Sequence, residues 1–134
     1  MRGNFLGETW FLALGDILAI GVVTLIGFAR HGEILSSGLR PLTTFVPLCL
    51  VWLLIAPFIG AYHPARASDV RQLWRPVVAA LVAAPFAAML RSVLLQTPIQ
   101  PVFVLVLGLA SALGLLIWRG IFILLLTRYR IADG

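Results

Sequence analysis

Four long apolar stretches, separated by short polar joints, dominate the pattern of hydrophobic and polar positions along this chain of 134 residues. They cover residues 10–28, 43–62, 73–95 and 101–126, and each approaches or exceeds the roughly 20 apolar residues that a helix needs to cross a bilayer. None shows the alternation with period two of a membrane β-strand. Because lipid admits only helices or closed barrels, the pattern predicts four membrane-spanning helices.

The joints between these stretches limit the topology. The first two carry charges, and the third, at 96–100, is a tight uncharged turn. Short connections place consecutive helices side by side and antiparallel. We therefore expect an all-α protein with a single domain over residues 1–134, an integral membrane up-down four-helix bundle.

Composition supports this class. The chain is 61% hydrophobic with a mean hydropathy of +1.05, whereas soluble domains are about 45 to 50% apolar. Ten arginines against five acids give a net charge of +5. Most of these arginines lie between apolar stretches, so we assign them to loops that meet anionic lipid headgroups and expect no nucleic-acid partner.

The distribution of arginines predicts the orientation. The N-terminus, the second joint and the C-terminal tail hold six, namely Arg2, Arg66, Arg71, Arg75, Arg128 and Arg130. The other side holds Arg30 and Arg40. By the positive-inside rule, both termini are expected in the cytoplasm and the protein in the plasma (inner) membrane. Trp10, Tyr62 and Tyr129 stand at the ends of stretches, as residues of aromatic belts do.

Small residues in the third and fourth stretches predict close helix packing. The third stretch has two rows spaced by four residues, formed by Ala79, Ala80, Ala83, Ala84, Ala87 and Ala88. The fourth offers Gly108 with Ala112, and Ala110 with Gly114. Such rows let a neighbouring backbone approach. Pro57 and Pro85 lie inside stretches and predict kinks.

Three charged residues, Asp16, Arg91 and Arg119, lie well inside the apolar stretches, where a charge costs on the order of 2.5 to 3.5 kcal/mol. At 1.5 Å of rise per residue, Asp16 lies roughly 4 to 5 Å, and Arg119 about 8 to 9 Å, to the cytoplasmic side of the middle of its helix. A guanidinium can cover that difference, so we expect an inner pair of Asp16 with Arg119. For Arg91, in the outer half, the expected partner is Glu33 or a carbonyl freed by a proline.

This polar site has two interpretations that the residues leave open. In one, a substrate or proton pathway crosses the two polar layers, with Arg30 and His31 lining an outer mouth. In the other, buried ion pairs only fix the helix register. We find no nucleophile arrangement, phosphate loop, dinucleotide fingerprint or metal-ligand spacing, so we expect no enzyme, no cofactor and no metal site.

Several short motifs carry a family resemblance: GDILA, ARHGE, WLLIAPFIGAY, the arginine of MLRSV, and IWRG. Together they resemble the family known as domain of unknown function 3054, small four-span prokaryotic membrane proteins. The resemblance covers nearly the whole chain and implies the fold and the membrane location, but no activity. It directs attention to Asp16, Arg30, His31, Trp52, Pro57, Gly60, Tyr62, Arg91 and Arg119.

The sequence is compatible with two functions. The first is a small transporter or channel-like protein that works as a homo-oligomer around the Asp16 and Arg119 site, with an anionic or neutral substrate favoured over a cation because arginines predominate. The second is a non-catalytic accessory or structural subunit that docks another membrane protein through its alanine-rich helix face. A membrane enzyme acting on lipid has the weakest support.

Overall fold

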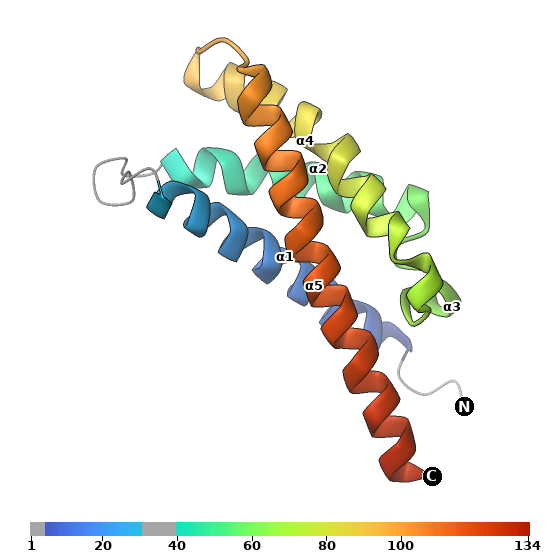
Figure 1. Cartoon of the computed structure of the whole chain (residues 1–134). Coiled ribbons are helices and arrows are strands. Elements are labelled where there is room, and N and C mark those ends of the chain that lie inside the picture. The colour runs from blue at the N-terminus through green and yellow to red at the C-terminus, as the bar shows by residue number, and fades with distance from the viewer. Residues whose placement is uncertain (1–4, 31–39) are drawn as a thin grey trace.

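The computed structural model describes residues 5–30 and 40–134, and within them four long helices carry the fold (Figure 1). All four are long and apolar enough to cross a membrane, which confirms the predicted all-α bundle. Between the second and third of them lie a short helix and a 3₁₀ turn. The elements are α1 (Phe5–Arg30), α2 (Arg40–Ile59), α3 (Pro64–Ala67), η1 (Val70–Gln72), α4 (Trp74–Leu95) and α5 (Pro101–Asp133).

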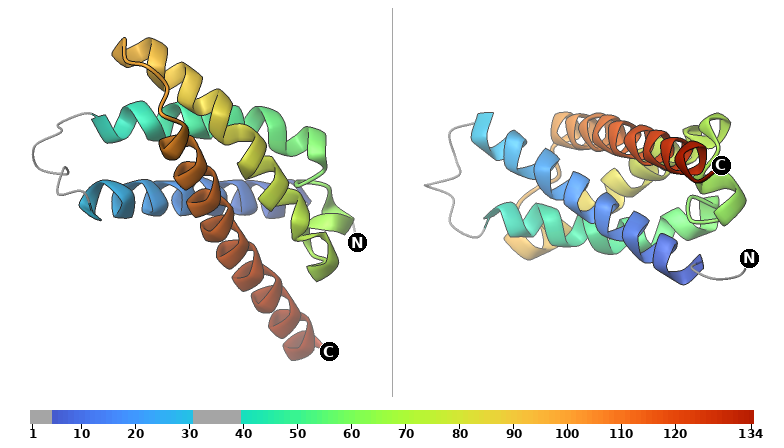
Figure 2. Two further views of the ribbon diagram at one scale, coloured as in Figure 1. Left: turned by 45° about the horizontal axis from the view of Figure 1, so that its top comes forward. Right: turned by 90° about the horizontal axis from the view of Figure 1, so that it is seen from below.

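The four long helices form a ring of neighbours. Helix α4 packs against α2 and α5, and α1 packs against α5 and α2. The start of α1, the α3 segment and the end of α5 lie at the same end of the bundle, as an up-down topology requires (Figure 1). Helix α5 runs obliquely across α1 and α2 and extends beyond the other helices at its C-terminal end (Figure 2, left).

Small side chains form the buried face of α4, and many large apolar side chains face outward. The six alanines of the α4 rows are 0 to 4% exposed, and a Cβ at Gly108 of α5 would lie 3.2 Å from that of Ala84. By contrast, Phe58 is 90% and Val102 73% exposed. In a bilayer the hydrophobic effect does not drive helices together, so close van der Waals packing through small residues does. The predicted rows therefore pack inside this chain, and the large apolar side chains face lipid.

Helix boundaries differ from the sequence prediction at the end of α2. We expected this helix to reach Tyr62, but it ends at Ile59, and the chain reverses at Gly60 with φ +81°. A left-handed residue ends many helices, and glycine adopts it without strain. Helix α2 runs through its interior prolines Pro47 and Pro57, and α4 runs through Pro85. The turn at Gly60 directs the residues that follow it, Ala61 and Tyr62, back toward the interior of the bundle.

Candidate functional site

The predicted inner ion pair is present and fully buried. Asp16 of α1 is 0% exposed and Arg119 of α5 is 2% exposed. Arg119 donates from Nη2 to Oδ2 of Asp16 at 2.8 Å and from Nε to Oδ1 at 3.0 Å. This two-pronged geometry is the strong form of the arginine–carboxylate interaction. The pair joins the first and last long helices of the chain.

Further donors and acceptors from α2 and from the turn that follows it complete the centre. Tyr62 donates its hydroxyl to Oδ2 of Asp16 at 2.5 Å, and Trp52 donates Nε1 to the Tyr62 hydroxyl at 2.9 Å. Arg119 donates from Nη1 to the carbonyl of Ala61 at 2.8 Å. Its guanidinium also lies over the Tyr62 ring, 5.1 Å from the centroid. Asp16 thus accepts three hydrogen bonds, which offset much of the cost of burying its charge.

The reversal at Gly60 places these groups. Because the chain turns back there, Ala61 is buried and Tyr62 points into the bundle. Arg75 of α4 holds the turn by donating from Nη1 to the carbonyl of Ile59 at 2.5 Å. The aromatic-belt interpretation of Tyr62 is therefore wrong, because the hydroxyl of Tyr62 contacts Asp16 inside the bundle. Burial, together with the neighbouring Asp16, raises the pKa of this phenol, so the hydroxyl remains a hydrogen-bond donor.

A close approach of α1 and α5 supports the ion pair. The ring of Trp118 lies against Gly15, where an added Cβ would be only 1.9 Å from the ring. Phe11 and Phe122 surround the same indole, with ring centroids 5.9 and 6.1 Å from it. The Gly15–Asp16 dipeptide thus meets the Trp118–Arg119 dipeptide, and only the absence of a side chain at position 15 permits this approach.

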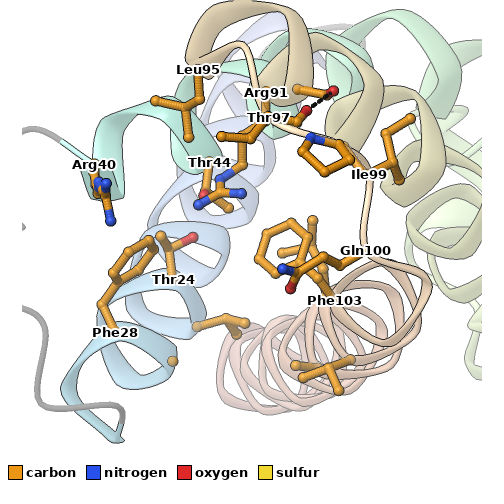
Figure 3. A pocket seen from close by; sticks show the side chains of 18 residues that line it. Thr24, Phe28, Arg40, Thr44, Arg91, Leu95, Thr97, Ile99, Gln100 and Phe103 are labelled. Carbon is orange, nitrogen blue, oxygen red and sulfur yellow. Dashed lines mark hydrogen bonds between the residues drawn. The ribbon is translucent and has the colours of Figure 1, made fainter.

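The second polar region is a pocket of about 560 Å³ at the end of the bundle opposite α3. All four long helices and the α4–α5 joint line it, and Figure 3 shows Arg91 pointing into it between Thr24 and Phe103. The Arg91 guanidinium lies over the Phe103 ring, 4.6 Å from its centroid. Arg40, at the start of α2, lies at the same pocket.

The predicted outer pair of Arg91 with Glu33 stays a prediction. Glu33 and His31 lie outside the described residues, and Arg30 ends α1 with its side chain outside them. The structure therefore brings together Asp16, Arg119, Trp52 and Tyr62 at one centre, with Gly60 forming the turn beside it. Pro57 lies outside this centre and accepts the Gly60 N–H at 3.0 Å as α2 ends.

One apolar layer separates the pocket from the ion pair. Along α1, Val23 of the pocket lies about 10 Å from Asp16 at the usual helical rise. Between the two levels, Ile20, Leu48 and Leu115 are each 1% exposed and belong to one core cluster. The two polar regions are therefore distinct, and packed apolar side chains lie between them.

Sequence reasoning found the charged pair but not its uncharged partners. Trp52 stood out only as a motif residue without a role, and Tyr62 was assigned to an aromatic belt. The carbonyl of Ala61 and the space at Gly15 were missed. A carbonyl leaves no mark in a sequence. The sequence offered one clue. Gly15 precedes the membrane acid Asp16, Trp118 precedes the membrane arginine Arg119, and the small residue makes room for the large one. Within residues 5–30 and 40–134, no three His, Cys, Asp or Glu side chains gather as metal ligands would.

The Tyr62 hydroxyl can be tested by Tyr62→Phe. We expect the free energy of unfolding to fall by about 1 to 3 kcal/mol, because both the Asp16 carboxylate and the Trp52 N–H lose a buried partner. Unfolding by SDS in dodecylmaltoside micelles, followed by circular dichroism, measures this. Tyr129→Phe is the matched control, since Tyr129 is 69% exposed. Equal stability of the two variants would contradict the assigned role.

Comparison with known protein families yields a match. The family model described as "Protein of unknown function (DUF3054)" matches residues 13–122. This range contains Asp16, Trp52, Tyr62, Arg91 and Arg119, and hence both polar regions. No curated protein and no solved structure matches the chain.

Proposed function

Because the chain belongs to the DUF3054 family, whose description assigns no activity, we propose a function from its own geometry: it is a small transport protein that carries a solute across the membrane as a homo-oligomer. One observation carries the proposal. A pocket of about 560 Å³ opens at one end of the bundle, and only one apolar layer divides it from the buried ion pair. In this proposal the protein is not an enzyme and uses no cofactor.

The pocket serves as the entrance and the ion pair as the closed barrier. Asp16 and Arg119 stand on different helices, so separating α1 from α5 would break their contact and open the layer of Ile20, Leu48 and Leu115. A transporter needs such an element with two arrangements, which the solute biases by binding one of them better. Four helices barely enclose a pathway, so a second copy would complete its wall.

The arginine distribution that predicts the orientation also supports an entrance on the outer side of the membrane. Arg66, Arg71 and Arg75 lie around α3, at the end opposite the pocket. If the protein lies in the plasma membrane with that end in the cytoplasm, as the positive-inside rule predicts, the pocket faces the outside of the cell. The solute would then enter from outside or leave toward it.

An accessory subunit is the second candidate, and one observation favours it. Each nitrogen of the Arg119 guanidinium already donates a hydrogen bond within the chain. The charge of Asp16 is compensated by this guanidinium, so Asp16 has little reason to change its protonation, as a residue of a proton pathway would. However, the alanine face of α4 lies in the interior, so docking a partner through that face is wrong for this structure. A partner would have to use the outward apolar surface instead.

Uptake into proteoliposomes tests the transport proposal. We would follow radiolabelled benzoate, phosphate, alanine and choline, and we expect at least one to enter faster than into protein-free liposomes. Gly27→Trp is expected to abolish that uptake by filling the pocket, because nothing lies within 4 Å of a Cβ at Gly27 and the added ring has room.

Leu25→Trp is the control, since Leu25 lies on the same helix and is 54% exposed toward lipid. Its uptake should equal that of the wild type. Wild-type uptake no faster than that of empty liposomes for all four solutes would reject transport of these solute classes. Unchanged uptake in Gly27→Trp would reject the pocket as the entrance.

A further inference from the structure

We infer that the connection between α2 and α4 binds the phosphate group of an anion between Arg66 and Arg75, and that an acidic phospholipid of the surrounding bilayer supplies this group. Arginine-rich loops are attracted to anionic membranes in general, whereas this site consists of two guanidinium groups that meet at one turn. Binding at this site is independent of the proposed transport.

Two arginine side chains from different segments meet at the Gly60 turn. Nη1 of Arg66, from α3, lies 2.5 Å from the position that a Cβ at Gly60 would occupy, and Nη1 of Arg75, from α4, lies 3.1 Å from the same position. Two positive charges this close repel each other, and an anion between them would replace the repulsion by attraction. A phosphate suits the place, because its several oxygens accept hydrogen bonds from more than one guanidinium.

The turn itself explains the position of Arg75 but not that of Arg66. Arg75 donates from Nε to Oε1 of Gln72 at 2.6 Å and from Nη1 to the carbonyl of Ile59 at 2.5 Å. It thereby satisfies the C-terminal end of α2, where a positive charge is favourable, and is held with Nη2 still able to donate. The Arg66 side chain reaches the same turn without a hydrogen bond or ion pair to any described residue. A bound phosphate would account for its approach.

One acid faces three arginines in this connection. Asp69 accepts the backbone N–H of Arg71 at 2.9 Å, as the cap of η1. Within residues 5–30 and 40–134, the ion pair that the structure contains is that of Asp16 with Arg119, so Asp69 does not pair with Arg66 or Arg75. The connection therefore keeps an excess of positive charge.

The surroundings of the site favour a lipid as the source of the phosphate. Helices α2 and α4 are both apolar and long enough to cross a membrane, and both end at this connection, which places it where bilayer meets water. Trp74 is 50% and Val70 62% exposed, and the Arg75 guanidinium lies over the Trp74 ring, 4.6 Å from its centroid. Tryptophan is typical of this level of a membrane protein. A lipid with its phosphate at Arg75 would lay its acyl chains on these side chains, whereas a soluble phosphate would gain nothing from them.

Two probes distinguish the sources in detergent-purified full-length protein. Native mass spectrometry compares the binding of dioleoylphosphatidylglycerol with that of zwitterionic dioleoylphosphatidylcholine. Isothermal titration calorimetry measures the binding of inorganic phosphate. We expect phosphatidylglycerol to bind at least tenfold more tightly than phosphatidylcholine, the factor that about 1.4 kcal/mol supplies, and also more tightly than inorganic phosphate, which has no acyl chains.

Variants of two arginines test the geometry. Arg66→Gln should lower the affinity for phosphatidylglycerol about tenfold, the effect of losing one charged hydrogen-bond partner. Arg66 is exposed, so its replacement leaves the fold intact. Arg66→Lys should recover part of the affinity, because lysine keeps the charge but lacks the guanidinium fork.

Arg71→Gln is the matched control. It removes the same charge from an exposed position of the same connection, while the atoms nearest the Cβ position of Gly60 belong to Arg66 and Arg75. The affinity of Arg71→Gln for phosphatidylglycerol should stay close to that of the wild type.

Each outcome decides. Equal binding of the two lipids together with no binding of inorganic phosphate overturns the inference. Equal loss of affinity in Arg66→Gln and Arg71→Gln also overturns it, since binding would then reflect only the general attraction of a basic loop. A preference for phosphatidylglycerol that depends on Arg66 assigns the site to an acidic lipid. Binding of inorganic phosphate that depends on Arg66, without a lipid preference, supports the phosphate site and rejects the bilayer as its source.

Discussion

Asp16→Asn is expected to destabilise the protein by about 3 to 5 kcal/mol, the usual cost of removing one partner from a buried ion pair. Arg119→Gln should cost less. The two partners differ because an abandoned aspartate can bind a proton and become neutral, whereas an abandoned arginine keeps its charge at any accessible pH. Arg119, at 2% exposure, would then be a buried cation that has lost its counter-charge.

The double variant completes this experiment. With both charges removed, we expect much of the stability to return, so that the free energies of the single variants do not add. Unfolding by SDS in dodecylmaltoside micelles measures all four proteins, with size-exclusion chromatography to record their oligomeric state. Arg128→Gln serves as the control for loss of an exposed arginine.

The opposite result has a clear meaning. Should Asp16→Asn be as stable as the wild type, the chain would be keeping a membrane carboxylate that its fold does not need. The structural interpretation of the pair would then fail, and liposome uptake by that variant would become the decisive measurement. Strong non-additivity would instead assign the pair to building the bundle.

Gly15→Ala is expected to lower the free energy of unfolding by about 1 to 3 kcal/mol, the range for overpacking a tight contact. An added Cβ would lie 1.9 Å from the Trp118 ring, so α1 and α5 would have to separate or the indole would have to leave its place between Phe11 and Phe122. Either movement also lengthens the Asp16–Arg119 hydrogen bonds.

A matched glycine on α5 isolates the effect of the clash. Nothing lies within 4 Å of a Cβ at Gly120, and alanine favours a helix over glycine by up to about 1 kcal/mol. Gly120→Ala should therefore be neutral or slightly stabilising in the same SDS titration. If Gly15→Ala matched it, the contact with Trp118 would not hold α1 and α5 together.

Much of this architecture follows from sequence because the bilayer imposes local rules. Every backbone group of a spanning segment must find its hydrogen bond within that segment, so length and hydropathy alone indicate the four spans. Depth and helix face could then pair Asp16 with Arg119 across 103 positions, since few charges lie at that level.

The boundaries and faces were less certain from sequence. An apolar stretch running to Tyr62 reads as one helix, although Gly60 ends it earlier. The alanine rows predict close packing, but they do not say whether the neighbour belongs to the same chain. Here it does, because α2 and α5 both pack on α4.

The amino-acid sequence by itself determined the class, the four spans and the central ion pair, since each depends on composition and spacing along one helix at a time. Only the tertiary structure decided that Tyr62, Trp52 and the Ala61 carbonyl complete that pair, and that Arg40, Arg91 and Thr44 share one pocket. These groupings depend on the reversal at Gly60 and on the crossing of α1 and α5 at Gly15. Both result from contacts among several helices, and no single stretch of the chain contains that information.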